Sequence, residues 1–176
     1  MFFFNKKPKP AETPTFNKSL CFYFQVHQPY RLSDCSFFNG PEHTNYFDGP
    51  QTCRNETVFN KVADKCYIPA TEMFLDLVKK NKSLKLTYSL SGVFLEQCEE
   101  FGEKGKYVLD LFRELHQTGQ VEFLAETYYH SLAFLYSKFE YAEHIKQHSE
   151  ALKRLFNAKP TVFRNTELIY NNELAE

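Results

Sequence analysis

Four short apolar runs alternate with helical patterns along this chain, and this alternation constrains the fold more than any other feature. The runs cover residues 20–26, 84–90, 121–126 and 161–165. Each connection between two runs is long enough for a right-handed helical crossover, so we expect parallel strands in that spatial order. The run at 20–26 is almost continuously apolar, which predicts a strand buried on both faces. The pattern indicates an α/β fold with helices packed outside a parallel sheet.

The segments between the runs carry apolar residues at helical spacing, together with start and stop signals for helices. Pro69 suits a first-turn position, and Gly119 suits a C-cap. Ser137 and Glu140 form a capping-box pattern. The predicted helices cover residues 69–80, 93–100, 107–117 and 139–157.

The composition argues against several classes of function. The formal net charge is −1, so we expect no nucleic-acid partner and no attraction to an anionic membrane. No apolar run approaches the ~20 residues of a membrane span, and no secretory signal is visible, which favours a cytoplasmic protein. The 5 cysteines lack the C-x-x-C spacing of zinc and redox sites, which favours reduced thiols and no metal. Nothing in the composition indicates an oligomeric state.

The chain divides into an arm and a larger folded part. Residues 1–18 are rich in Lys, Pro, Thr and Asn, and predict a flexible N-terminal arm. Residues 30–55 form a long polar segment, typical of a lid or a binding loop. Four parallel strands make only an open half-barrel with an exposed edge. We therefore expect residues 19–176 to be the N-terminal part of a larger βα-barrel domain, in a truncated chain.

The fourth run ends in Arg164, Asn165 and Thr166 around the carboxylate of Glu167. A carboxylate held by such donors stays ionised, and at the carboxyl end of a strand it can act as a nucleophile on an anomeric carbon. The alternative is an ordinary surface glutamate.

Two further carboxylates belong to the third run: Glu122 lies within it and Glu126 ends it. If Glu122 faces the barrel interior, Glu126 does too, because strand side chains alternate. Alternatively Glu122 faces a helix and pairs with a cation; the spacing leaves these alternatives open. The block at 127–131 contains Tyr128 and His130 and is dense in hydrogen-bonding aromatics, which suit sugar hydroxyls.

The histidines divide into two groups. His27 directly follows the first run and is a candidate for the active face, although a lone histidine there is more often structural. Glu143, His144 and His148 lie on one predicted helix. The i,i+4 histidines could bind a metal, but the motif lacks the glutamate of H-E-x-x-H. We interpret them as a solvated helix face.

Three of these segments, in this order, resemble the sequence regions of glycoside hydrolase family 57. Residues 24–29 (FQVHQP) look like its first region, residues 119–122 (GQVE) its second, and residues 163–168 (FRNTEL) its third. That family contains α-amylases, 4-α-glucanotransferases, branching enzymes and amylopullulanases. The resemblance spans roughly residues 19–176. It implies the first four βα units of an incomplete seven-stranded βα barrel.

The resemblance also implies a retaining glycoside hydrolase or transglycosylase acting on α-glucans, with no cofactor. Glu167 would be the nucleophile, and the acid/base would be an aspartate on a later strand, outside this chain. The truncated chain alone is therefore expected to be inactive. The substrate-binding candidates are His27, Glu122, Glu126, Tyr128, His130 and Arg164. The alternatives are a metal-dependent polysaccharide deacetylase-like enzyme and a catalytically inactive carbohydrate-binding homologue.

Overall fold

The computed structural model describes residues 20–33, 38, 46–48 and 53–174. The predicted arm at 1–18 lies outside these residues, as do parts of the predicted long loop at 30–55. The elements are, in order, β1 (Tyr23–Val26), α1 (Asn55–Val62), the π-helical turn η2 (Ala63–Tyr67), α2 (Ile68–Lys80), β2 (Leu86–Leu90), α3 (Gly92–Glu100), α4 (Gly102–Gln117), β3 (Val121–Phe123), η3 (Ala133–Leu135), α5 (Lys138–Phe156), η4 (Thr166–Leu168) and η5 (Asn172–Leu174).

The three described strands form a parallel sheet in the order β1-β2-β3. Tyr23 pairs with Thr87, and Thr87 pairs with Glu122. The α/β class, the parallel direction and this spatial order confirm the prediction. The expected fourth strand is instead a single parallel bridge between Ala125 and Phe163. Its two hydrogen bonds join Ala125 N to Val162 O (2.9 Å) and Arg164 N to Ala125 O (2.8 Å).

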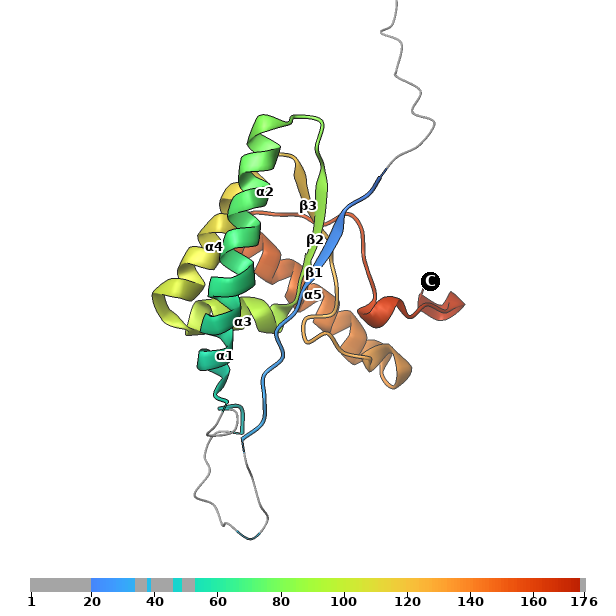
Figure 1. The fold of residues 1–176 in the computed structure, drawn as a ribbon. Helices are drawn as coiled ribbons and strands as arrows, with labels where there is room; N and C mark the ends of the chain where they lie inside the picture. The colour runs from blue at the N-terminus through green and yellow to red at the C-terminus, as the bar shows by residue number, and fades with distance from the viewer. Residues whose placement is uncertain (1–19, 34–37, 39–45, 49–52, 175–176) are drawn as a thin grey trace, which may run out of the picture.

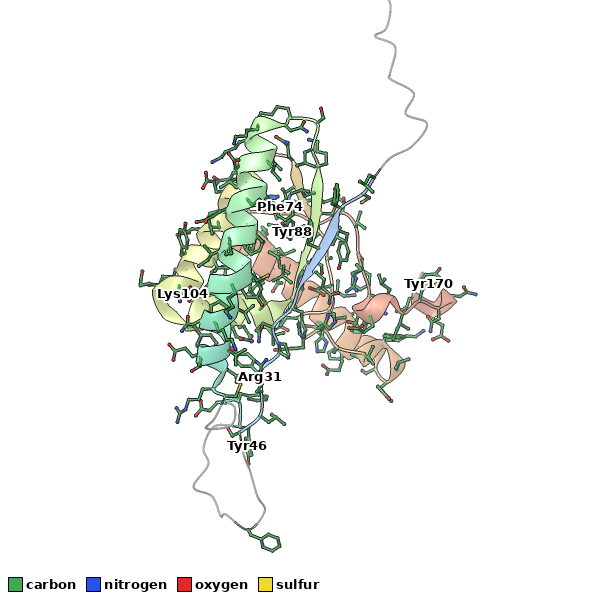
Figure 2. The ribbon with its side chains drawn as sticks, in the orientation of Figure 1. Arg31, Tyr46, Phe74, Tyr88, Lys104 and Tyr170 are labelled. Atoms are coloured by element: carbon green, nitrogen blue, oxygen red, sulfur yellow. The ribbon has the colours of Figure 1, made fainter. Side chains whose placement is uncertain are left out.

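Helices cover one face of this sheet (Figure 1). Figure 2 shows Tyr88 of β2 beside Phe74 of α2. These two rings meet edge-on at 6.5 Å, and the Phe24 and Phe74 rings lie 4.8 Å apart. Phe112 of α4 packs edge-on against Tyr88 at 5.6 Å. Aromatic side chains from neighbouring elements therefore hold the helices to the strands, which accounts for much of the high phenylalanine content.

The first strand is less buried than its sequence predicts. The prediction of a strand buried on both faces is wrong, because Leu20 and Phe22 are exposed and β1 itself is only half-buried. Its apolar residues pack on α2 from one side only. A continuous apolar run shows that a segment is extended, but it does not show how many faces are covered.

The helix predicted at 69–80 begins earlier, at Asn55, and runs through α1, η2 and α2. Pro69 lies in the first turn of α2, as predicted, but α1 and η2 precede it without a break, so it has no N–H to offer the carbonyl four residues back. The π-helical turn η2 lies just before it and is closed by a hydrogen bond from Ile68 N to Ala63 O. This wider turn accommodates the hydrogen bond that Pro69 cannot make. The capping box is confirmed, since Ser137 Oγ accepts a hydrogen bond from Glu140 N at 3.2 Å.

Candidate active site

Polar side chains follow each strand at the edge where the parallel strands end. His27 follows β1, Ser91 follows β2, and Glu126 follows β3 and its bridge residue Ala125. Glu167 follows the segment that pairs with Ala125. Because the carboxyl ends of parallel strands meet at one edge, these groups come together there.

His130 lies at the centre of a group that we call the histidine–carboxylate cluster: His27, Glu126, His130 and Glu167. The His130 ring stacks on His27 with centroids 4.4 Å apart. Its Nδ1 lies 3.2 Å from Glu126 Oε2 and its Nε2 lies 3.0 Å from Glu167 Oε1. Both ring nitrogens can donate only when the imidazole is charged. The pKa of His130 is accordingly raised, first by the hydrogen bond to Glu126 and further by Glu167, against the opposing effect of burial.

Glu167 combines an accessible carboxylate with a strained backbone. Its side chain is 69% exposed, whereas that of His130 is 8% exposed. Glu167 and Leu168 both have positive φ, at 55° and 58°, a conformation that is unfavourable for residues other than glycine. The hydrogen bond from His130 lowers the pKa of the Glu167 carboxyl. The site therefore presents an accessible carboxylate that is oriented by the side chain of His130, whose pKa is raised.

The donors that hold Glu167 differ from those expected. Asn165 Nδ2 donates to Ile169 O at 2.8 Å, and the Thr166 and Thr127 hydroxyls lie 2.9 Å apart. These two residues fix the turn rather than the carboxylate, so the expectation that they bind Glu167 is wrong. His130 takes that role from another segment, a contact that depends on the turn between β3 and α5.

His27 is held by residues that the sequence analysis did not connect with it. Its Nδ1 lies 2.8 Å from Ser91 Oγ, the N-cap of α3. The next residue, Gln28, accepts hydrogen bonds from Gln97 Nε2 at its carbonyl (2.5 Å) and from the Tyr67 hydroxyl at Oε1 (3.1 Å). Burial, and then the charge of His130, lower the pKa of His27. The pKa values of the two stacked imidazoles are therefore shifted in opposite directions, that of His27 downwards and that of His130 upwards.

The interpretation of His144 and His148 as a solvated helix face is wrong. His148 is fully buried, with Nε2 2.8 Å from Leu90 O and Nδ1 3.3 Å from Glu126 N. One nitrogen donates and the other accepts, so the ring is neutral, and burial lowers its pKa. These two hydrogen bonds join α5 to the ends of β2 and β3. His144 Nδ1 lies 2.8 Å from Ser131 Oγ.

The remaining candidates lie around the cluster rather than in it. The carboxylate of Glu122 accepts a hydrogen bond from Thr161 at 3.1 Å, near the start of the strands. Tyr128 is buried, packs against Gly92, and donates to Glu96 at 3.0 Å, so it offers no open ring face. The Arg164 guanidinium lies 5.5 Å from the centre of the Tyr23 ring. Among the described residues, no hydrogen bond joins Glu122 to the cluster.

A family model described as "Glycosyl hydrolase family 57" matches residues 21–176. The chain belongs to glycosyl hydrolase family 57. It is 48% identical, over 158 residues, to a protein of Methanocaldococcus jannaschii named "Putative alpha-amylase". That match covers 89% of the chain and 32% of the relative, so the chain spans about a third of the relative's length.

Solved structures share the fold of this family 57 chain. The 4-alpha-glucanotransferase from Thermococcus litoralis has a TM-score of 0.61 at 21% identity, over 88% of this chain and 20% of that one. The alpha-amylase AmyC from Thermotoga maritima has a TM-score of 0.53 at 14% identity, over 88% of this chain and 36% of that one. The branching enzyme from Pyrococcus horikoshii has a TM-score of 0.53 at 18% identity, over 84% and 34%.

The family match favours the glycosidase interpretation over the deacetylase-like alternative. Within residues 20–33, 38, 46–48 and 53–174, no three His, Cys, Asp or Glu side chains are grouped so as to hold a metal ion. No helix of the same residues is both long and apolar enough to cross a membrane.

Proposed function

We propose that the protein containing this chain is a retaining glycoside hydrolase or transglycosylase that acts on α-glucans, with Glu167 as its nucleophile. The observation that carries the proposal is the accessible carboxylate of Glu167, held 3.0 Å from His130 in the segment that resembles the third region of the family. The names of the relatives, an alpha-amylase, a glucanotransferase and a branching enzyme, support an α-glucan as the substrate.

In the proposed first step, an oxygen of Glu167 attacks the anomeric carbon of a glucosyl unit. The bond from that carbon to the glycosidic oxygen breaks, and a general acid protonates the leaving oxygen. Water or a sugar hydroxyl then attacks the same carbon, gives its proton to the conjugate base and releases Glu167. The family resemblance assigns the acid to an aspartate on a later strand, about 5–5.5 Å from the nucleophile in retaining enzymes.

The cluster suits this chemistry. His130 lowers the pKa of Glu167 and orients its carboxylate, and Glu126, buried beside His130, raises the pKa of that histidine. His27 offers a ring nitrogen to a sugar hydroxyl from the same edge. We further propose that β1 to β3 and the bridged segment at 163 are the first four βα units of an incomplete seven-stranded barrel, with residues 19–176 as its N-terminal part and with Glu122 and Arg164 on its inner side.

The test replaces the nucleophile in the full-length protein. Glu167→Gln keeps the shape but cannot form the glycosyl ester, so maltooligosaccharide turnover is expected to fall by roughly 10³-fold or more. Glu173→Gln is the matched control, because Glu173 is also exposed and lies close by in sequence; its turnover is expected to equal wild type. Turnover of Glu167→Gln within tenfold of wild type would assign the nucleophile to another residue.

A further inference from the structure

A cleft of about 540 Å³ opens beside the histidine–carboxylate cluster. This volume falls within the range of small-molecule sites. His27 belongs to both, since it lines the cleft and stacks on His130. The cleft therefore adjoins the place where a sugar would meet Glu167. Its other main lining residues are aromatic or acidic: Tyr30, Phe47, Glu96, Glu100 and Tyr129.

The two carboxylates lie one turn apart on α3 and so share one helix face. Each is oriented by a phenol. Tyr30 donates to Glu100 Oε2 at 2.7 Å, and Tyr128 donates to Glu96 Oε1 at 3.0 Å. A carboxylate has two oxygens and about four acceptor positions, so one phenol leaves each of them able to accept further hydrogen bonds from a ligand with several hydroxyl groups.

The aromatic rings supply flat surfaces in fixed positions. Tyr129 is 44% exposed and is held edge-on by Tyr128, at 4.9 Å, and by His144, at 5.1 Å. Tyr30 and Phe47 meet edge-on at 6.1 Å. A pyranose ring has one face of C–H groups and a rim of hydroxyls, so it matches a site that combines aromatic faces with carboxylate acceptors.

We propose that this cleft is a subsite for a further glucosyl unit of the α-glucan, beyond the unit that Glu167 attacks. The inference rests on the proposed function and extends it to chain length. The two carboxylates disfavour an anionic sugar, because a phosphate or uronate would face like charge. The cleft therefore selects neutral glucosyl units, and its contribution appears only with substrates long enough to reach it.

The experiment measures binding of maltooligosaccharides of increasing length by calorimetry, in full-length protein carrying Glu167→Gln so that the ligand is not consumed. Tyr129→Ala and Glu100→Gln are added in turn. For the longer oligosaccharides, each variant is expected to bind roughly tenfold more weakly, which is the loss expected when one important contact is removed. For the shortest oligosaccharides, the affinity is expected to change little. Thermal unfolding of each variant verifies that it is folded; Glu100→Gln keeps the acceptor for Tyr30 and serves if Tyr129→Ala does not fold.

A matched pair on the outside of the molecule is the control. Tyr107 of α4 is 46% exposed and donates to Glu72 at 2.7 Å, as Tyr30 does to Glu100. Tyr107→Ala and Glu72→Gln are expected to leave binding unchanged at every length. The subsite would be overturned if the cleft variants bound as tightly as these controls. It would also be overturned if the cleft variants lost the same affinity for oligosaccharides of every length. Turnover by Glu167→Gln would instead overturn the nucleophile assignment, so the two failures are distinguishable.

Discussion

The two faces of the sheet carry different kinds of side chain. On one face, Tyr88, Phe123 and their alternating neighbours pack against Phe74, Phe112 and other side chains of α2, α4 and α5. On the other face, the alternation of strand side chains places Tyr23, Gln25, Thr87, Ser89 and Glu122. The packed face carries apolar side chains of the core, whereas the polar face leads to the histidine–carboxylate cluster.

The difference shows in the hydrogen bonds. Among the described residues, most of the buried side-chain polar atoms without a well-formed hydrogen bond lie on or next to the polar face: Tyr23 Oη and Ser89 Oγ, which neighbour each other, Glu126 Oε1, and Arg164 Nε and Nη1. The others are Gln97 Oε1 of α3 and Gln120 Oε1. Such groups cost free energy of folding, and in a native structure they call for an explanation. We infer that this face is built for ligand chemistry and that stability is supplied from the opposite side.

The largest expected effect tests the packed face. Phe112 is almost fully buried and packs edge-on against Tyr88 and Phe94. Phe112→Ala is expected to lower the free energy of unfolding by about 3–5 kcal/mol, while kcat per folded molecule stays near wild type. Exposed Phe139→Ala is the control, with an expected change within about 0.5 kcal/mol. Denaturant unfolding and active-site-normalised rates measure both. A fall in kcat of Phe112→Ala without a fall in its unfolding free energy would contradict the assignment of a purely structural role to the packed face.

The next effect tests the polar face. His130→Gln removes the charged donor to Glu167 and is expected to lower kcat by roughly 10²-fold, about 2.7 kcal/mol. Since His130 lowers the pKa of Glu167, the acid limb of the rate profile should move to higher pH in the variant. A merely structural role would not move that limb.

His116 provides the matched control for this variant, because it stacks on Phe123 at 4.9 Å on the packed face. His116→Gln is expected to change stability and leave the pH profile in place. An unmoved acid limb in His130→Gln would mean that His130 does not act through Glu167.

The contrast also separates what the sequence could predict from what it could not. The apolar periodicity of the strand and helix segments predicted the parallel order of β1, β2 and β3, since repeated patterns average over local detail. A single bridge at Phe163 stands in place of the predicted strand, and the chain then enters the 3-10 turn Thr166–Leu168, in which Glu167 and Leu168 have positive φ. An apolar pattern carries no information on where such a turn begins.

For the candidate site, the sequence predicted where the polar residues lie along the strands, but it did not predict which side chains contact one another. His27, Glu126 and Glu167 were expected at strand ends, and they lie there. Their connection through His130 depends on a turn with φ 53°, and the burial of His148 depends on how α5 crosses the strand ends. Both are tertiary facts, which residue types and spacing in one sequence do not encode.

A pH-dependent prediction sharpens the comparison further. The folded-state pKa of His130 is raised above its usual 6.5, so its stabilising interactions with Glu126 and Glu167 are fully present below about pH 6.5 and lost as pH rises through the raised pKa. The difference in unfolding free energy between wild type and His130→Gln should therefore shrink with rising pH. His148 should behave oppositely, because burial lowers its pKa: its neutral form is favoured, and the folded state loses stability as pH falls below about 6.5. Urea unfolding of wild type, His130→Gln and His148→Gln across this pH range measures these free energies. The same pH dependence of the stability difference for both variants would contradict the assignment.

The smallest expected effect concerns one hydroxyl. The Tyr23 ring lies beneath the Arg164 guanidinium, and its buried Oη faces the Ser89 hydroxyl without a well-formed hydrogen bond. Tyr23→Phe keeps the cation–π contact and removes the orphaned group, so the free energy of unfolding is expected to stay the same or rise by up to about 1 kcal/mol. Tyr67→Phe is the matched change on the packed face. It removes the 3.1 Å hydrogen bond to Gln28 and should cost about 0.5–1.5 kcal/mol. Equal losses for the two variants would show that the Tyr23 hydroxyl is as well bonded as that of Tyr67, and the polar face would then be structural at this position rather than reserved for a ligand.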